Sequence, residues 1–254
     1  MQKFDIDPDI RVAETLPARF YTDDLLFELS KERIFARTWQ ATVIASKIGS
    51  VLPTTMLAGF LDEPVVFTRM NGQLRCLSNV CTHRAKIVAE EECGATGLRC
   101  RYHGRRFDLE GRFVSMPEFD EALNFPSERD NLPRIAVETF EDLVLVSLNP
   151  LAPVSEFVGE VVSATEELYR ERPEFRWERE YEVNAHWALY CENYLEGFHV
   201  PFVHESLNRS IDYGTYRTET HRYSSVQIAE SRDPSLTFDG RIAAYYYFVF
   251  PNLM

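Results

Sequence analysis

The chain has 254 residues, of which 45% are hydrophobic and 26% charged, and its formal net charge is −13. This length allows one large domain or two moderate ones, and the composition is that of an ordinary soluble protein. The acidic balance argues against nucleic acid or an anionic membrane as the main partner. No apolar run is long enough to cross a bilayer, and residues 1–20 do not resemble a secretory signal, so we expect a cytoplasmic protein.

The first predicted element is a helix over residues 23–39, for which Thr22 or Asp23 can serve as the N-cap. From Trp39 to about Pro150 the pattern changes to short β-prone runs separated by turn signals such as Asn71-Gly72. These runs cover residues 41–46, 54–61, 64–70, 74–80, 106–109 and 143–149. Their length and spacing predict a small antiparallel β domain.

The remainder of the chain predicts a second unit. We expect a helix over 154–172, a strand over 177–190, a helical segment over 191–208 and mainly strands from 213 to 254. The overall prediction is an α+β fold in three parts: a helical segment 1–38 that packs on the second domain, the β domain 39–150, and a domain 151–254 with an antiparallel sheet and helices. Because the final run AAYYYFVFPNLM would be aggregation-prone as an exposed edge, we expect a longer natural polypeptide.

Cysteine and histidine gather in one part of the β domain. The five cysteines are an odd number, which suits a disulfide framework poorly, and the pattern Cys81-x-His83, sixteen residues, Cys100-x2-His103 interleaves thiols with imidazoles. Two Cys on one iron and two His on the other would hold a [2Fe–2S] cluster. The same four residues also suit tetrahedral zinc, and unrelated buried Cys and His are a third possibility. Spacing alone leaves these alternatives open.

The stretches NVCTHRA (79–85) and CRYHGRRFDLEGRF (100–113) closely resemble the Rieske family. The resemblance implies a Rieske-type [2Fe–2S] cluster bound by Cys81, His83, Cys100 and His103. One residue departs from the pattern, because the family usually has Trp after His-Gly and this sequence has Arg105. Arg105 is not a ligand, so the departure bears on packing near His103 or on docking of an electron donor, and not on cluster binding.

A second constellation lies in CENYLEGFHVPFVH, residues 191–204. On one continuous helix Glu192, Glu196 and His199 would share a polar stripe, while His204 would point about 140° away from His199. A break at Pro201 could bring His204 back, which suits the two-histidine half of a 2-His-1-carboxylate site for non-haem Fe(II). A surface amphipathic helix with two solvated histidines is the alternative.

The longer stretch HWALYCENYLEGFHVPFVH resembles the catalytic domain of Rieske non-haem iron oxygenase large (alpha) subunits. The resemblance implies that His199 and His204 bind a mononuclear Fe(II) and that Asn193 lies beside it. Glu196 would take the place of the acidic residue that links this iron to a cluster histidine of a neighbouring subunit. The third ligand would be a carboxylate beyond residue 254. The downstream Asp212, Asp233 and Asp239 match no motif, and none is assigned.

Together these resemblances imply the terminal component of an oxygenase that uses O2 and NAD(P)H-derived electrons, delivered by a ferredoxin or reductase. A homotrimer or an alpha/beta hetero-oligomer is expected. Because most relatives hydroxylate aromatic rings, as monooxygenases or dioxygenases, we expect an aromatic substrate first. Residues 193–204 and 211–220 also resemble choline, betaine and carnitine monooxygenases, so a quaternary ammonium substrate is the alternative. Tyr213, Tyr216 and Tyr245–Tyr247 could then form an aromatic cage, or they could equally be core residues. A non-catalytic Rieske electron carrier with an incomplete iron site and a zinc-stabilised binding module remain as alternatives.

Overall fold

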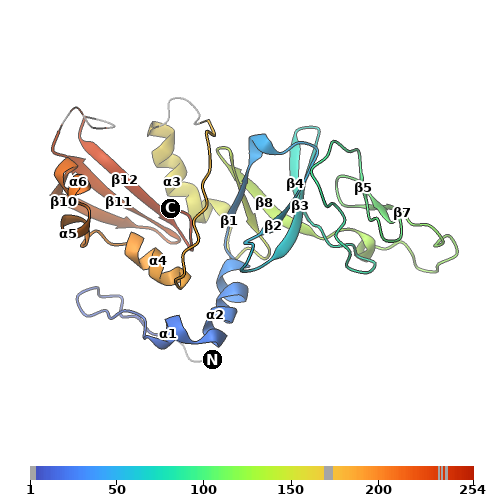
Figure 1. The fold of residues 1–254 in the computed structure, drawn as a ribbon, viewed down its shortest axis with the longest axis horizontal. Coiled ribbons are helices and arrows are strands. Elements are labelled where there is room, and N and C mark those ends of the chain that lie inside the picture. The colour runs from blue at the N-terminus through green and yellow to red at the C-terminus, as the bar shows by residue number, and fades with distance from the viewer. Residues whose placement is uncertain (1–3, 169–173, 234, 236, 238–239) are drawn as a thin grey trace.

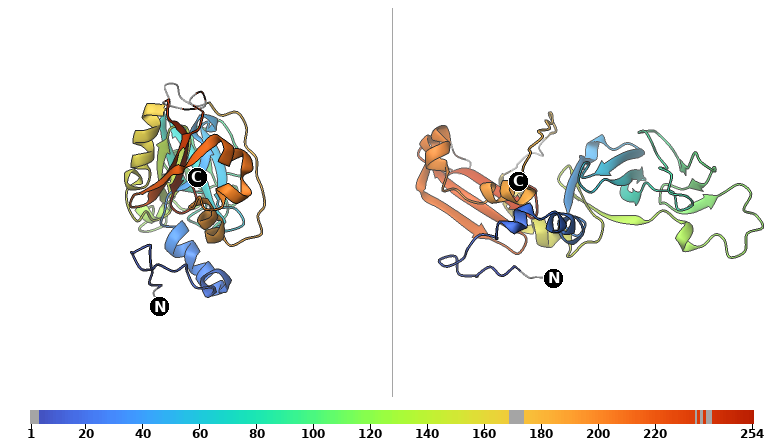
Figure 2. Two further views of the ribbon diagram at one scale, coloured as in Figure 1. Left: turned by 90° about the vertical axis from the view of Figure 1, so that its left-hand side faces the viewer. Right: turned by 60° about the horizontal axis from the view of Figure 1, so that its bottom comes forward.

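The computed structural model describes residues 4–168, 174–233, 235, 237 and 240–254. Figure 1 shows an elongated molecule with a six-stranded sheet in the middle. A small three-stranded sheet lies at one end, and a second three-stranded sheet with short helices lies at the other. Figure 2 shows the same arrangement from two further sides. In the described part of the chain no helix is both long enough and apolar enough to span a bilayer.

The N-terminal segment forms α1 (Arg19–Thr22), α2 (Asp24–Ser30) and a π-helical turn η1 (Lys31–Phe35). The Asp23 side chain accepts the Leu25 N–H at 2.9 Å and caps α2, which confirms the predicted helix start. Aromatic edges of Phe20 and Phe27 meet His186 at ring-centroid distances of 5.5 and 5.6 Å. The segment therefore contacts the second half of the chain.

The central sheet is antiparallel, with the order β1-β9-β8-β4-β3-β2. Its strands are β1 (Gln40–Ile44), β2 (Val51–Met56), β3 (Glu63–Met70), β4 (Gln73–Ser78), β8 (Arg134–Phe140) and β9 (Leu143–Ser147). A 3-10 turn η2 (Ala45–Lys47) follows β1. The run 54–61 is strand only to Met56, because the chain turns at Leu57 with φ 48°. Strand β8 is not among the predicted strands.

Both faces of this sheet are covered. Val65 and Phe67 point to one core with Val144, whereas Val66 and Leu77 point to the other, which also contains Cys81 and Cys100. The second face also supports the small sheet of β5 (Leu98–Arg99), β6 (Arg106–Phe107) and β7 (Phe113–Ser115), followed by a 3-10 turn η3 (Glu128–Asp130). Two of the predicted cluster cysteines are thus part of a well-packed core.

The second half begins with α3 (Val154–Leu168), as predicted, and the predicted residues 169–172 lie outside the described residues. Helices α4 (Trp187–Tyr194), α5 (Val200–Val203) and α6 (Glu205–Ser210) lead into β10 (Ile211–Thr220), β11 (Ser224–Ser231) and β12 (Ile242–Val249). These strands confirm the predicted antiparallel sheet. Phe157 of α3 packs with Trp39, Leu145 and Val249, so the two halves share a hydrophobic core.

The predicted strand over 177–190 is wrong. Residues 174–186 have no strand partner and helix α4 starts at Trp187, where His186 Nδ1 accepts the Ala188 N–H at 3.2 Å. The apolar residues that suggested a strand are largely exposed: Trp177 at 71% and Tyr181 at 72%. β-propensity reflects packing against neighbouring strands, and no strand among the described residues pairs with this segment.

Candidate metal centres

The first predicted ligand pair sits in a tight loop after β4. An isolated antiparallel bridge joins Val80 to Ile87 and closes the base of this loop. Inside it the Cys81 N–H donates to the Lys86 carbonyl at 2.9 Å, and the Ala85 N–H donates to the Cys81 carbonyl at 3.0 Å. Ala85 adopts a positive φ of 54°, which turns the chain back.

The second predicted pair sits in a loop of the same construction, closed at its base by the pairing of β5 with β6. The Cys100 N–H donates to the Arg105 carbonyl at 2.8 Å, and the Gly104 N–H donates to the Cys100 carbonyl at 3.1 Å. Gly104 has φ 74° at the position that Ala85 occupies in the first loop. The two loops therefore repeat one backbone pattern, each opening on a cysteine.

The structure brings the four side chains together in two pairs. Cys81 and Cys100 are buried, at 3% and 2% exposure, and their thiols are close enough to hydrogen-bond. The His83 and His103 rings lie 4.7 Å apart between centroids, at an interplanar angle of 70°. His103 is exposed and His83 half-buried. Sulfur ligands thus face the core and nitrogen ligands face the solvent.

Local electrostatics favour the neutral imidazole. Burial lowers the pKa of His83, and neighbouring cations, of which His103 is the first, lower it further. Burial also raises the pKa of the Cys81 thiol, and Cys100 raises it further, against the opposing hydrogen bond from the His83 N–H. Neutral imidazole is the form that binds metal, and a metal would supply the positive charge that two adjacent thiolates need.

Paired ligands distinguish a two-iron cluster from zinc. Tetrahedral zinc would need both thiols and both imidazoles around one point. Among the described residues no three His, Cys, Asp or Glu side chains gather in that way. Two thiols on one side and two imidazoles on the other match the donor set of a Rieske cluster, in which each iron takes one pair. The two cysteines and two histidines therefore fit a Rieske [2Fe–2S] cluster.

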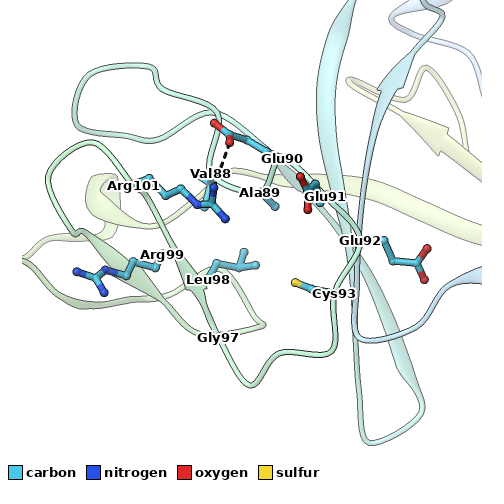
Figure 3. A pocket seen from close by; sticks show the side chains of 10 residues that line it. All are labelled: Val88, Ala89, Glu90, Glu91, Glu92, Cys93, Gly97, Leu98, Arg99 and Arg101. Atoms are coloured by element: carbon cyan, nitrogen blue, oxygen red, sulfur yellow. Dashed lines mark ion pairs between the residues drawn. The ribbon is translucent and has the colours of Figure 1, made fainter.

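A salt bridge on the solvent side spans the two loops. Glu90 contacts Lys86 of the first loop at 2.6 Å and Arg101 of the second at 3.6 Å. Figure 3 shows Glu90 facing Arg101 across a cleft of about 500 Å³ between residues 88–93 and 97–101. All three side chains are substantially exposed, so solvent screens this bridge and it contributes little to stability.

The remaining cysteines have other environments. Burial raises the pKa of Cys76 to about 12 and that of Cys191 to about 11, so both are neutral thiols. The Cys191 thiol donates to the Pro251 carbonyl at 3.1 Å, and Cys93 is exposed. Cys76 and Cys191 are thus buried thiols and Cys93 is a surface thiol.

The second constellation does not form one continuous helix. Helix α4 ends at Tyr194, and α5 starts only at Val200, so the predicted single stripe of Glu192, Glu196 and His199 is wrong. Glu192 faces the N-terminal segment and accepts the Tyr21 hydroxyl at 2.6 Å. Pro201 stands in the first turn of α5, where the missing N–H costs little, and starts the helix where we expected a break.

Despite this correction, the two histidines meet. His199 is the N-cap of α5 and His204 ends it, with φ −111° and ψ 69°. Their ring centroids are 5.0 Å apart, at an interplanar angle of 70°. The chain leaves helical geometry at His204, and this local change aims both rings at one region.

Glu196 holds His199 within the same chain. With the proton on Nδ1, His199 donates to one oxygen of the Glu196 carboxylate, while the other accepts the N–H groups of Phe198 and His199. Burial alone would raise the pKa of Glu196, but these hydrogen bonds outweigh it, so the pKa lies below its usual range. An ionised Glu196 fixes the ring and leaves Nε2 free to bind a metal.

Other candidate residues take different places. Asn193 is exposed on α4, and its position beside an iron stays a prediction. The carboxylates of Asp212 and Asp233 accept hydrogen bonds within their own turns, from Gly214 and Ser235, and Asp239 lies outside the described residues. We therefore find no third ligand in the described part of the chain.

A network of hydrogen bonds between tyrosine and glutamine, which the sequence did not predict, supports the segment that carries His199. The Tyr216 hydroxyl donates to buried Gln227 at 2.8 Å, and the Gln227 amide donates to the Tyr194 carbonyl at 2.7 Å. A Cβ at Gly197 would lie 2.6 Å from the Tyr216 ring, so only glycine fits there. Of the tyrosines considered for an aromatic cage, Tyr213 and Tyr216 pack in the apolar core.

The two candidate centres lie far from each other in the chain. Figure 1 places α5 and α6 at one end of the molecule and β5 and β7 at the other, with the six-stranded sheet between them. The second view of Figure 2 agrees. One chain therefore presents the two centres on opposite ends.

Comparison with known proteins places a known domain over the first centre. Residues 43–140 match the model of the Rieske [2Fe-2S] domain. The chain is 28% identical over 271 residues to chloroplastic choline monooxygenase of Arabidopsis thaliana, covering 98% of this chain and 64% of that protein. It is 27% identical over 246 residues to the carnitine monooxygenase oxygenase subunit of Escherichia coli K12, covering 93% of this chain and 65% of that protein. The chain thus spans less than two thirds of either relative.

Solved structures share the fold. The quaternary ammonium Rieske monooxygenase CntA matches with a TM-score of 0.77 at 22% identity, over 95% of this chain and 67% of that one. Naphthalene 1,2-dioxygenase matches with a TM-score of 0.63 at 24% identity, over 81% and 52%. Residues 43–140 thus match a Rieske [2Fe–2S] domain, and the whole chain shares the fold of these structures. More specifically, the chain is a homologue of the oxygenase subunits of choline and carnitine monooxygenases.

Proposed function

We propose that this chain carries the electron-receiving cluster and two iron ligands of a Rieske-type oxygenase that hydroxylates a small organic substrate. The observation that supports an oxygenase most strongly is the second histidine pair. His199 and His204 lie 5.0 Å apart, and Glu196 orients the first of them. An electron carrier has no use for this arrangement, whereas a non-haem Fe(II) site needs it.

The cluster loops would serve electron entry. When bound, the [2Fe–2S] cluster would supply electrons one at a time, and an Fe(II) at the second centre would activate O2. His103 brings the nitrogen side to the surface, while Cys81 and Cys100 keep the sulfur side in the core. Exposed Arg84 and Arg101 beside His103 favour a donor with an acidic surface, such as a ferredoxin or reductase.

The opposite placement of the two centres favours electron transfer between subunits. Electron transfer weakens steeply with distance, and in one chain the six-stranded sheet lies between the elements that carry the two centres (Figure 1). A ring of identical chains, such as a homotrimer, would bring the exposed His103 of one subunit towards Glu196 of the next. A related solved structure carries the description of a quaternary ammonium Rieske monooxygenase with inter-subunit electron transfer.

For the substrate, we infer a quaternary ammonium compound over an aromatic ring. The relatives that cover 93–98% of this chain act on choline and carnitine, whereas naphthalene dioxygenase shares the fold at 24% identity. An ammonium group with no hydrogen-bond donors would be recognised by aromatic faces and negative charge. Ring hydroxylation, the first expectation from sequence, remains the second candidate.

Iron titration tests the proposed function. Fe(II) is added to protein already loaded with its cluster, and bound iron is counted per chain. We expect a third iron beyond the two of the cluster, and we expect His199→Ala to abolish it while leaving the visible spectrum of the cluster unchanged. Two irons per chain, unaffected by His199→Ala, would instead identify a Rieske electron carrier.

A colourless preparation that contains one zinc per chain would contradict both functions and support the zinc-stabilised module. For the substrate class, choline and carnitine are compared with naphthalene as stimulants of O2 consumption by the reduced protein. Stimulation by naphthalene alone would overturn the ammonium assignment.

A further inference from the structure

One cation is buried directly beside the second ligand loop. The Arg105 side chain is only 3% exposed, although a guanidinium remains charged at any physiological pH. Arg105 lies two residues after His103, and its carbonyl accepts the Cys100 N–H, which closes the loop. Lys86 takes the same position in the first loop, but its side chain is 44% exposed. The sequence therefore places a solvated cation on one loop and a desolvated cation on the other.

Three aromatic rings surround the Arg105 guanidinium. The centroids of Phe107, Phe113 and Phe125 lie 5.8, 5.0 and 5.6 Å from its central carbon. Its Nε is buried and has no hydrogen-bond partner. Ring faces stabilise a desolvated cation, but they do not neutralise it. Its charge consequently acts in a medium of low polarisability, where electrostatic effects reach further than at the surface.

The hydrogen bonds of Arg105 converge on Asp130. Its Nη2 donates to the Asp130 carboxylate and, at 3.2 Å, to the Asp130 carbonyl. That same carbonyl accepts the hydroxyl of Thr82 at 2.8 Å. Thr82 lies between Cys81 and His83 in the first loop. Asp130 therefore joins the two ligand loops from the core side, with one donor from each.

The carboxylate of Asp130 is itself fixed. Its second oxygen accepts the Ser127 N–H at 2.7 Å and the Ser127 hydroxyl at 3.0 Å, which closes the capping box of η3. Because both oxygens of the Asp130 carboxylate accept hydrogen bonds, the carboxylate is held in place, and it holds the Arg105 guanidinium in one position. The exposed bridge through Glu90 also spans the loops, but on the solvent side, where charge is screened.

We propose that Arg105 is a positioning and tuning residue for the cluster: it fixes the spacing of the two ligand loops through Asp130 and raises the reduction potential with its buried charge. Reduction adds negative charge to a cluster, and a nearby desolvated cation stabilises the reduced form. Asp130 acts in the opposite sense on the potential, although it shares the positioning role. This inference rests on the [2Fe–2S] cluster and not on the proposed oxygenase activity.

The test compares charge changes of opposite sign. Midpoint potentials are measured by redox titration of the visible circular dichroism, and cluster loss is followed as bleaching in moderate urea with an iron chelator. In Arg105→Met we expect the midpoint potential to fall by about 59 mV. At a fixed applied potential, the ratio of oxidised to reduced cluster would then rise on the order of tenfold. In Asp130→Asn we expect a higher potential. Both variants should bleach faster than the wild type.

Two further variants separate position from charge. Thr82→Val removes one donor to Asp130 and no charge, so it should bleach faster at an unchanged potential. Glu90→Gln breaks the exposed bridge and should change neither quantity. Arg105→Lys keeps the charge but not the forked geometry, so its midpoint potential should stay close to that of the wild type. This variant keeps the test available if Arg105→Met does not fold.

A shift of the same sign in Arg105→Met and Asp130→Asn, or no shift in either, would overturn the tuning role. If the clusters of Arg105→Met and Thr82→Val bleached at the same rate as that of the wild type, the positioning role would be overturned. If the wild type shows no Rieske spectrum at all, the cluster assignment itself fails, whereas loss of hydroxylation with these shifts intact contradicts only the proposed oxygenase.

Discussion

Individual side chains in both centres are held by an acidic partner. Glu196 orients His199 at the second centre, and Asp130 holds Arg105 beside the first. Both acids keep a lowered pKa although burial opposes it, because several hydrogen bonds favour the ionised form. At the residue scale, the chemistry depends on the hydrogen-bond partners around the predicted ligands as much as on the ligands themselves.

Glu196 provides a residue-scale prediction. Glu196→Ala removes the acceptor of His199 Nδ1, so we expect Fe(II) affinity at the second centre to fall about 10- to 100-fold. Glu196→Gln keeps an acceptor oxygen but not the charge, so it should bind Fe(II) nearly normally and reduce turnover sharply. Calorimetric Fe(II) titration and O2 consumption measure the two effects, and unchanged turnover in Glu196→Gln would argue against a role in electron transfer.

Asp130 predicts an acid-dependent stability. Burial raises its pKa, but the Ser127 N–H and the Arg105 guanidinium lower it more, so the pKa of Asp130 in the folded protein lies below its usual range. A lowered folded pKa means that the stabilisation is complete above about pH 4 and is lost as the pH falls through the folded value. Urea unfolding of Asp130→Asn and wild type should therefore differ most near neutral pH and converge in acid. A constant difference at all pH values would contradict this.

At the scale of elements, the two ligand loops are the same turn used twice. Each opens on a cysteine, closes on a carbonyl five residues later and contains one positive φ, at Ala85 and at Gly104. The loops differ in where the histidine falls, two residues after Cys81 and three after Cys100. This difference lets both rings point to the same side.

The positive-φ positions allow a paired test. In Ala85→Gly, relief of the left-handed strain offsets the entropy of glycine, so we expect a stability change within about 0.5 kcal/mol. In Gly104→Ala, the φ of 74° and a new contact 3.3 Å from Pro117 should destabilise by about 1–2 kcal/mol. Chemical denaturation of both variants measures the asymmetry. Equal effects would indicate that backbone conformation does not limit these loops.

Local sequence predicted most elements, and its failures have physical reasons. Ligand spacing located both loops because a cysteine–histidine turn is a local feature. The strand over 177–190 failed because β-prone residues need a partner strand. The stripe of Glu192 and Glu196 failed because α4 ends at Tyr194 and helix resumes only at Val200. The Asp130–Arg105 contact joins residues 25 apart in sequence, and no local pattern announces it.

At the scale of the whole molecule, the important feature is the separation of the two centres (Figure 1). The six-stranded sheet and α3 share a core with Trp39 and Val249, so the two ends are connected through packed structure. A chain built in this way needs either a flexible carrier or a second copy to bring a cluster to an iron site. We favour the second copy.

Subunit mixing tests that assembly. Cys81→Ser, which removes a cluster ligand, and His199→Ala, which removes an iron ligand, should each be inactive alone. In mixed oligomers of the two variants, an intact cluster of one subunit would adjoin an intact iron site of its neighbour. We therefore expect co-expression to recover part of the choline- or carnitine-dependent O2 consumption. Mixed oligomers that form but show no recovery would place both steps within one chain.

We infer that His83 and His103 bind one iron of a two-iron cluster while Cys81 and Cys100 bind the other. Pulsed electron paramagnetic resonance of the reduced protein, grown with 15N-histidine, tests it directly. We expect strong coupling to two histidine nitrogens, reduced or abolished in His83→Ala and His103→Ala. A paramagnetic cluster with no nitrogen coupling would contradict it, as would a preparation without any reducible cluster.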